Sequence, residues 1–220
     1  MKTAMILAAG RGERLKPLTE KIPKAMCIVQ GLPLIEHHVL KLAQAGFTRL
    51  VINHAYLGGQ IRQHLGNGAR WNIEICYSPE PPGGLETGGG IAKALALLGN
   101  KPFITVNADI YTDFDFNLLH FESVPYLHLV LVKNNPELAH HGDFGLLNQK
   151  QLTNTATDYT FAGIACYNPQ VLTSLPLGRY SISLLMRHYA KEGKATAELY
   201  QGNWFDIGSL ERLNAANNFI

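Results

Sequence analysis

Short apolar runs recur along the chain, and their lengths suit β-strands buried inside a fold. They cover residues 4–9, 50–53, 73–77, 103–107, 127–132 and 161–167. Stretches compatible with helices separate several of these runs. The resulting order of strand, helix, strand and helix is typical of α/β proteins.

Two helices are predicted between these strands. Apolar residues recur at helical spacing over residues 34–44 and stop before Gly46, a C-terminal cap, and Gly99 ends a second helix over residues 90–98. The alternation predicts a mainly parallel sheet with helices on both of its faces and right-handed crossovers. Ligands of such a sheet bind outside the C-terminal ends of its strands.

The pattern changes from about Asn134 onward, where polar and glycine-containing stretches surround short apolar ones. This part predicts hairpin-like structure laid over the sheet rather than another strand–helix unit. A final helix is predicted over residues 210–218, with Ser209 as its cap and Glu211 in its positively polarised first turn. No linker, repeat or low-complexity tract divides the chain, so we expect one domain over residues 1–220.

The composition excludes several classes of protein. Of the 220 residues, 46% are hydrophobic and 16% are charged, which is enough to bury a sizeable core. A formal charge of +2 without long basic runs is unlike a nucleic-acid-binding surface but compatible with small anionic ligands. The scattered Cys27, Cys76 and Cys166 form neither a disulfide framework nor a C-x-x-C zinc pair, which favours a reducing cytoplasm.

No apolar stretch predicts a membrane segment. The longest runs fall far short of the roughly 18 apolar residues that span a bilayer. The N-terminal run over residues 4–9 continues into a charged, glycine-rich loop instead of a cleavage site, so it does not indicate a secretion signal.

That loop, residues 10–14 (GRGER), follows a strand predicted to end at Ala9. Glycines let the backbone turn tightly and bring N–H groups close to a phosphate chain, while Arg14 offers a planar fork of donors. Leu15 at the sixth position breaks both the P-loop and the dinucleotide fingerprint. The loop therefore predicts a phosphate site, with an ordinary strand-to-helix turn as the alternative.

Two aspartates form the candidate metal site. Asp109 follows the strand predicted over residues 103–107, so its carboxylate emerges where ligands gather. Asp206 lies in an aromatic-flanked turn about a hundred residues later. Two hard oxygen ligands from distant loops suit Mg²⁺, which binds one or two carboxylates together with substrate phosphates. Capping of a helix or turn is the alternative for either aspartate.

Three other features carry weaker signals. The glycines at residues 88–90 precede a helix, so their N–H groups could face a base, ribose or phosphate, although such runs are also common turns. Lys24 lies in an irregular segment, where an exposed lysine usually contacts only solvent. The pairs at residues 37–38 and 140–141 are adjacent histidines without a third ligand at matching spacing, so we expect no metal there.

Taken together, these motifs resemble those of sugar-1-phosphate nucleotidyltransferases, a family with a Rossmann-like nucleotide-binding core. The resemblance begins at LAAGRGER (residues 7–14) and continues through PLT, PK, LETGGG, NAD, FAG and WFDIG, so it covers essentially the whole chain. Within the family, the short length and residues 51–55, 85–91 and 204–213 look closest to the N-acetylmuramate 1-phosphate uridylyltransferases.

The resemblance implies a nucleotide-binding portion over about residues 1–109 and a sugar-phosphate-binding portion over about residues 110–220. As catalytic groups, Lys24 would neutralise the reacting phosphates and Arg14 the departing pyrophosphate, and Asp109 would hold Mg²⁺ together with Asp206. The resemblance also implies a set of substrate contacts. In this set, Glu80 and Gly88 lie near the base, and Gly145, Thr160 and Gly163 lie near the sugar. The full set is Ala9, Gly10, Gly12, Glu80, Gly88, Asn107, Gly145, Thr160 and Gly163. Two departures are Ala25 and Ala108, where many relatives have proline and glycine respectively.

The implied reaction is in-line attack by a sugar-phosphate oxygen on the α-phosphorus of a nucleoside triphosphate. The expected pair is UTP with N-acetylmuramate 1-phosphate. Mannose 1-phosphate with GTP, glucose 1-phosphate with dTTP and phosphocholine with CTP share the core motifs. The lactyl carboxylate of muramate would need a cation near the sugar, for which Arg179 and Arg187 are candidates.

Two other functional classes fit the chain less well. A catalytically inactive nucleotide-sugar sensor should lose the carboxylates that this chain keeps. A nicotinamide-dependent oxidoreductase should carry the dinucleotide fingerprint, which this chain lacks. We expect a monomer or weak dimer, binding neither nucleic acid nor membrane.

Overall fold

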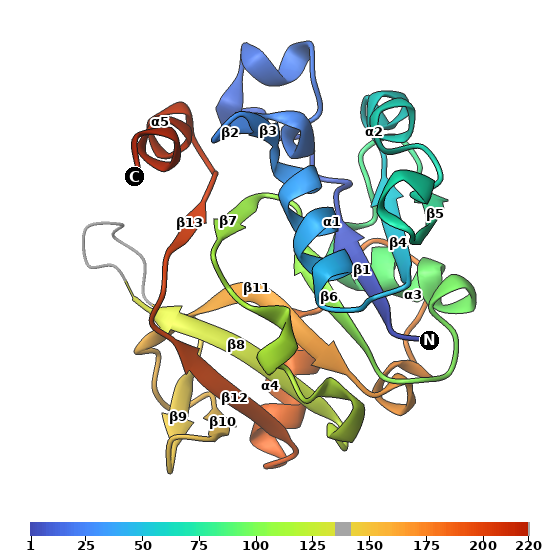
Figure 1. The fold of residues 1–220 in the computed structure, drawn as a ribbon. Coiled ribbons are helices and arrows are strands. Elements are labelled where there is room, and N and C mark those ends of the chain that lie inside the picture. Colours follow the sequence, from blue (N-terminus) through green and yellow to red (C-terminus); the bar gives the residue numbers. More distant parts are fainter. Residues whose placement is uncertain (135–141, 220) are drawn as a thin grey trace.

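The computed structural model describes residues 1–134 and 142–219 and shows a mixed sheet with helices packed on both faces (Figure 1). The second histidine pair, residues 140–141, lies outside the described residues. Within them, the sheet has the strand order β5-β4-β1-β6-β11-β8-β12-β10-β9. The strands are β1 (Thr3–Leu7), β4 (Arg49–His54), β5 (Glu74–Pro79), β6 (Phe103–Asn107), β8 (Leu127–Lys133), β9 (Gly145–Leu147), β10 (Gln151–Thr153), β11 (Tyr159–Tyr167) and β12 (Ala195–Tyr200).

The first half of the sheet is parallel. In β5, β4, β1 and β6 all strands run the same way, and Leu7 pairs with both Asn53 and Asn107 at the ends of the neighbouring strands. The carboxyl ends of these strands therefore meet at one edge. In the second half, β11 runs antiparallel between β6 and β8, and β12 is parallel to β8. The predicted α/β fold with a Rossmann-like sheet is confirmed, with antiparallel strands added to its second half.

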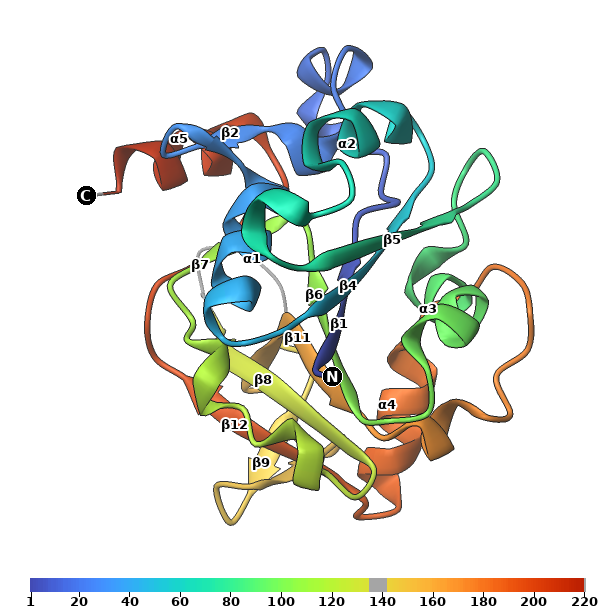
Figure 2. The ribbon, with the colours of Figure 1, turned by 45° about the vertical axis from the view of Figure 1, so that its right-hand side comes forward.

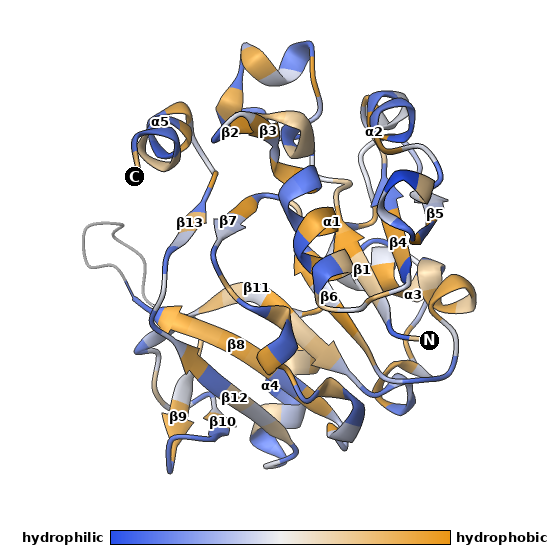
Figure 3. Ribbon diagram, viewed as in Figure 1, coloured by the Kyte–Doolittle hydropathy of each residue, from blue (hydrophilic) through white to orange (hydrophobic). Residues whose placement is uncertain are grey.

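The side chains of β1 alternate between two cores. Ala4 and Ile6 pack on the face covered by α1 (Leu34–Gln44) and α2 (Gly58–Leu65). Met5 packs on the other face, which α3 (Glu86–Leu98) and α4 (Ser183–Lys191) cover. Figure 2 shows α1 and α3 on opposite sides of β1 and β4. Figure 3 shows the resulting apolar strands in the interior, with polar residues concentrated on the outer helices and loops.

Most predicted elements are confirmed to within a few residues. The bounds of α1 and of α5 (Leu210–Asn218) match the predicted ones, and the hydroxyl of Ser209 accepts a hydrogen bond from the N–H of Arg212 at 3.3 Å. However, α3 begins at Glu86, four residues before the predicted start. Other segments pack directly against its three glycines, with Tyr180 at Gly88, Gly178 at Gly89, and Glu80 and Asn53 at Gly90, so a side chain at any of these positions would meet a neighbour.

The hairpin prediction needs a correction. The strands β9 and β10 do form a hairpin, but it extends the edge of the sheet instead of lying over it. Gln151 pairs with Thr196 of β12, a strand whose alanines and polar residues gave no apolar run. The edge of β12 offers unpaired backbone groups, which the hairpin covers.

Two small ladders lie outside the main sheet. One pairs β2 (Ile28–Val29) with β3 (Leu32–Pro33). The other pairs β7 (Ile110–Thr112) with β13 (Trp204–Asp206), so that the C-terminal segment returns to the end of β6. Of the described helices, none combines the length and the apolar character needed to cross a bilayer.

Candidate active site

A cleft of about 470 Å³ opens at the carboxyl ends of β1, β4 and β6. We call it the first cleft. Its walls include residues 7–11, Asn53, Lys24 and residues 107–109, together with the start of α3. The parallel strands bring these segments together because their ends share one edge of the sheet.

Lys24 and Asp109 form an ion pair within this cleft. The Nζ of Lys24 donates to Oδ2 of Asp109 at 2.6 Å, and the lysine side chain is 12% exposed. Gly12 packs directly against the lysine, with φ +71° and no room for a side chain. The hydroxyl of Thr19 also donates to the carbonyl of Gly12 at 2.8 Å. The glycine loop and the lysine segment are therefore held together beside the carboxylate.

Asp206 reaches the same place through the β7–β13 ladder. It pairs with Ile110, the residue after Asp109, and the N–H of Ile207 donates to the carbonyl of Asp109 at 2.9 Å. The Oδ2 atom of Asp206 accepts a hydrogen bond from Arg212 Nη1 at 2.6 Å. Figure 1 shows β7 and β13 side by side. The backbones of the two predicted metal ligands thus lie side by side in the fold although the residues are far apart in the sequence.

These carboxylates fit a hard divalent cation. Each uses Oδ2 for its cationic partner, Lys24 or Arg212, and none of the described residues hydrogen-bonds to its Oδ1. Within residues 1–134 and 142–219, no cluster of three or more His, Cys, Asp or Glu side chains could enclose a metal. A cation here would need further oxygen ligands from a substrate, which is how Mg²⁺ commonly binds with phosphates.

Asn53 organises the opposite wall of the first cleft. Its Oδ1 accepts from the N–H of Ala8 at 2.8 Å, and its Nδ2 donates to Oε1 of Glu80 at 2.6 Å. The other oxygen of Glu80 accepts from the N–H of Leu85 at 2.6 Å. Glu80 therefore closes the turn that carries Gly84, and Asn53 connects that turn to the end of β1.

Burial keeps a histidine neutral beneath the metal-ligand candidates. His38 of α1 is fully buried, and its Nε2 donates to the carbonyl of Ile110 at 2.9 Å. Desolvation lowers the pKa of His38 to about 4, despite the opposing effects of that hydrogen bond and of Asp109. The neutral ring thus anchors the strand that follows Asp109.

A second cleft of about 670 Å³ lies between the ends of β8, β11 and β12 and the helix α5. We call it the second cleft. Its walls combine aromatic, polar and charged side chains, including Thr160, Tyr200, Trp204, Asp206 and Arg212. The indole of Trp204 donates to the carbonyl of Ala162 at 2.9 Å, which fixes the ring. Asp206 lines this cleft, and its backbone pairs with Ile110, the residue that follows Asp109.

The sequence model of the nucleotidyl transferase family matches residues 3–220. The chain belongs to this family. It is therefore an enzyme of the nucleotidyltransferase class, and the resemblance seen in its motifs is confirmed.

The relatives extend over the same length. The chain is 44% identical to the N-acetylmuramate alpha-1-phosphate uridylyltransferase of Neisseria meningitidis over 97% of its own length and 96% of that protein. It is 30% identical to the enzyme of the same name from Caulobacter vibrioides over 98% and 95% of the two chains. A mannose-1-phosphate guanylyltransferase catalytic subunit beta from Danio rerio is 28% identical and is covered over 61% of its length.

Solved structures show the same fold. A putative glucose-1-phosphate thymidylyltransferase from Bacillus anthracis aligns with a TM-score of 0.87 at 24% identity, covering 99% of this chain and 94% of that one. Apo UDP-glucose pyrophosphorylase aligns with a TM-score of 0.80 at 19% identity, covering 99% and 97%. At these identities the likeness concerns the fold alone.

The two arginines of the glycine loop of this nucleotidyltransferase take different places. Arg14 does not line the first cleft and lies near Gly208, with its Nη2 3.0 Å from the position that a Cβ there would occupy. Arg11, which the sequence interpretation left unassigned, lines the first cleft and sits 5.0 Å over the ring of Tyr56. Arg14 thus lies beside the segment of Asp206, while Lys24 pairs with Asp109 in the first cleft.

Gly88 lies outside both clefts. Its N–H donates to the carbonyl of Tyr180 at 2.9 Å, and the tyrosine ring fills the space where a Cβ would be. Its amide therefore serves the packing of α3 instead of facing the first cleft. The helix start that lines the cleft consists of Glu86 and Thr87.

The three residues expected near the sugar also separate. Thr160 lines the second cleft, and Gly163, with φ +79°, packs against the side chain of Asn107. Gly145 is buried against Ala156 and lines neither cleft. Of the other expected contacts, Ala9, Gly10 and Asn107 line the first cleft.

The sequence interpretation did not include Asn53 among the site residues, although its position along the chain indicated such a role. It is a polar residue at the carboxyl end of an otherwise apolar strand, the feature that identified Asp109. The sequence gives no comparable indication for Arg212, because its contact with Asp206 depends on how α5 packs.

Proposed function

We propose that this nucleotidyltransferase transfers a uridylyl group from UTP to N-acetylmuramate 1-phosphate, giving UDP-N-acetylmuramate and pyrophosphate. The observation that supports the chemistry is the convergence of Lys24, Asp109 and Asp206 at one edge of the sheet between two clefts. The choice of substrates is supported by two full-length relatives that carry this activity in their names.

The two clefts suggest where each substrate binds. The nucleotide would occupy the first cleft, formed largely by residues 1–109, and the sugar would occupy the second, formed by residues beyond 110. The reacting phosphates would then meet between Asp109, which lines the first cleft, and Asp206, which lines the second. Mg²⁺ would be held by these carboxylates together with phosphate oxygens, and when bound it would supply positive charge to the phosphates.

In the proposed step, an oxygen of the sugar phosphate attacks the α-phosphorus while the bond to the bridging oxygen of pyrophosphate breaks. The ammonium of Lys24 has three donors, of which Asp109 engages one, so the others are available to phosphate oxygens. The pairing with Asp109 and the contact with Gly12 hold the lysine in place before substrate arrives. The attacking phosphate is already ionised near neutral pH, so no general base is required.

Most of the catalytic effect would come from positioning and charge. Both substrates are anions, and holding them in line requires cations arranged in advance. Other pairs, such as mannose 1-phosphate with GTP, glucose 1-phosphate with dTTP and phosphocholine with CTP, use the same chemistry and differ in pocket contacts. The proposed product would serve recycling of cell-wall sugars in the cytoplasm.

The experiment is pyrophosphate release by the purified protein with Mg²⁺. UTP, dTTP, GTP, CTP and ATP would each be combined with a panel of sugar 1-phosphates that includes N-acetylmuramate 1-phosphate. We expect turnover with UTP and N-acetylmuramate 1-phosphate to exceed every other pair. A different preferred pair would replace the proposed substrates, and silence across the panel would favour a nucleotide-sugar sensor.

A further inference from the structure

Among the residues that the structure describes, one cationic side chain of the second cleft has no hydrogen-bond or ion-pair partner. Three charged side chains line the cleft, Lys133, Asp206 and Arg212. Arg212 is bound to Asp206 at 2.6 Å. The side chain of Lys133 is exposed at the end of β8 and forms no hydrogen bond or ion pair with a described residue, while its backbone pairs with Tyr159 of β11. Among the described charged side chains of this cleft, Lys133 is therefore the one available to a ligand.

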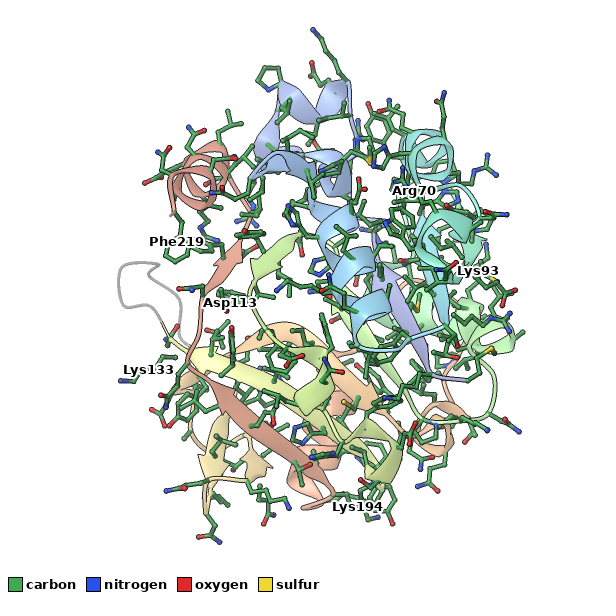
Figure 4. The ribbon with its side chains drawn as sticks, in the orientation of Figure 1. Arg70, Lys93, Asp113, Lys133, Lys194 and Phe219 are labelled. Carbon is green, nitrogen blue, oxygen red and sulfur yellow. The ribbon has the colours of Figure 1, made fainter. Side chains whose placement is uncertain are left out.

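This cation lies at the end of a strand pair that leads from the first cleft to the second. Gly163 packs on Asn107, which lines the first cleft, while Thr160 pairs with Val132, the neighbour of Lys133. Strand β11 therefore leads from Gly163, beside the first cleft, to Thr160 in the second cleft, with a register shift against β8 between Phe161 and Ala165. A sugar whose phosphate lies at the first cleft would extend along this strand toward Lys133. Figure 4 shows Lys133 extending past the end of β8, away from the sheet.

The other walls of the second cleft match an amino sugar. Tyr200 and Trp204 offer aromatic surfaces for a sugar ring, and Thr160 and Gln201 offer polar groups for an acetamido substituent. The indole of Trp204 is fixed by its hydrogen bond to Ala162, so this wall is set in advance. In N-acetylmuramate 1-phosphate, the group left to recognise is the carboxylate of the lactyl ether on C3.

The arginines suggested by the sequence are less suitable. Arg179 lines the first cleft and pairs with Glu86 at 3.2 Å. Arg187 lines neither cleft, since it donates to the carbonyl of Asp143 and lies over the ring of Phe144. Both are therefore engaged elsewhere.

Resting on the proposed function, we propose that Lys133 selects sugar 1-phosphates that carry a carboxylate substituent by pairing with that carboxylate. An amine donor to a carboxylate is a charge-assisted hydrogen bond. Sugars without the carboxylate lose this contact but keep the ring and phosphate contacts. Lys133 is thus a residue for specificity, separate from the Lys24 that serves the phosphates.

The test compares two sugars that differ only in the lactyl group. KM and kcat with UTP and Mg²⁺ would be measured for N-acetylmuramate 1-phosphate and N-acetylglucosamine 1-phosphate, using wild type, Lys133→Gln and Lys133→Glu. Lys101→Gln, at an exposed turn between α3 and β6, is the matched control. Glucuronate 1-phosphate and glucose 1-phosphate form a second pair that differs in a carboxylate.

We expect Lys133→Gln to raise KM for N-acetylmuramate 1-phosphate about fivefold, the size of one exposed charge pair. Lys133→Glu should raise it further because it places like charges together. KM for N-acetylglucosamine 1-phosphate and all values of Lys101→Gln should stay unchanged. Equal changes for both sugars, or none, would overturn the role of Lys133 while leaving the proposed function intact.

The proposed function can also fail separately. If wild type turns over neither N-acetylmuramate 1-phosphate nor glucuronate 1-phosphate, both the proposed sugar and the role of Lys133 are overturned. If wild type turns over glucuronate 1-phosphate but not N-acetylmuramate 1-phosphate, the proposed sugar is replaced. In that case Lys133→Gln must raise KM for glucuronate 1-phosphate but not for glucose 1-phosphate. The absence of that difference would overturn the role of Lys133.

Discussion

Replacement of Gly12 by alanine should separate backbone strain from a close contact in the active site. Gly12 has φ +71°, and a Cβ there would lie 3.0 Å from both Lys24 Cβ and Thr19 Cγ2. Gly31 is a matched control, since its φ is +82° and nothing lies within 4 Å of its Cβ position. Both variants adopt the left-handed conformation with a side chain, but only Gly12→Ala also introduces a clash.

The expected magnitudes follow from these two terms. Left-handed backbone strain costs about 1 kcal/mol for a residue with a side chain. Overpacking of one methyl group against fixed neighbours adds about 2 kcal/mol. Gly31→Ala should therefore lose about 1 kcal/mol of unfolding free energy, and Gly12→Ala about 3 kcal/mol.

The same contact predicts an effect on activity. Because the added methyl group pushes on the Lys24 segment, it should move Nζ away from Asp109 and the phosphates. Turnover of Gly12→Ala should fall at least about tenfold, since small displacements of catalytic groups are costly, while that of Gly31→Ala should be normal. The measurements are urea unfolding and pyrophosphate release on folded protein. Equal stability losses and normal turnover in both variants would refute the idea that Gly12 positions Lys24.

Three further predictions concern the site and its supports. Asp109→Asn should leave the fold intact by circular dichroism but reduce pyrophosphate release at least about a hundredfold; near-normal turnover would exclude a role in binding the cation. Ser209→Ala should lower the unfolding free energy by about 1 kcal/mol in urea, because it removes the hydrogen bond to the N–H of Arg212 at the start of α5; no loss would mean that this cap contributes nothing. The pKa of His38 falls from 6.5 in the unfolded chain to about 4 in the folded protein, so between pH 4 and 6.5 the histidine binds a proton when the protein unfolds. Stability should therefore decrease as the pH falls from about 6.5 to 4, by up to about 3 kcal/mol, and this part should be absent in His38→Gln. If wild type and His38→Gln show the same dependence of unfolding free energy on pH, the lowered pKa of His38 is contradicted.

The parallel half of the fold was predictable because its strands are buried on both faces. Such strands are continuous apolar runs, and the polar residue that follows each one marks the edge where ligands bind. This is why the sequence placed Asp109 just after β6, where the first cleft opens, and why the same reasoning applied to β4 would have singled out Asn53. The sequence predicted the start of α3 at Gly90 instead of Glu86, because glycine has a low intrinsic helix propensity.

The second half depends on contacts between distant segments. The strand β12 contains alanine, threonine and glutamate, and it is stabilised by pairing with β8 instead of by its own pattern. The environment of Gly88 is set by Tyr180, and that of Gly145 by Ala156. A glycine in a recognised motif therefore indicates close packing, but the sequence alone does not tell whether a ligand or another part of the chain fills the space.

The position of Asp206 depends on the attachment of the C-terminal segment. The β7–β13 ladder is only three residues long, which is too short to be stable alone. Asp113, after β7, accepts from the N–H and side chain of Asn203 at 2.9 and 2.6 Å, and Figure 4 shows it where β7 meets the segment before β13. On the other side of the ladder, Ile207 and Leu213 are buried in a small core with Leu15. Because Leu15 directly follows the glycine loop, the packing of α5 in this core couples the placement of Asp206 to the loop that positions Lys24.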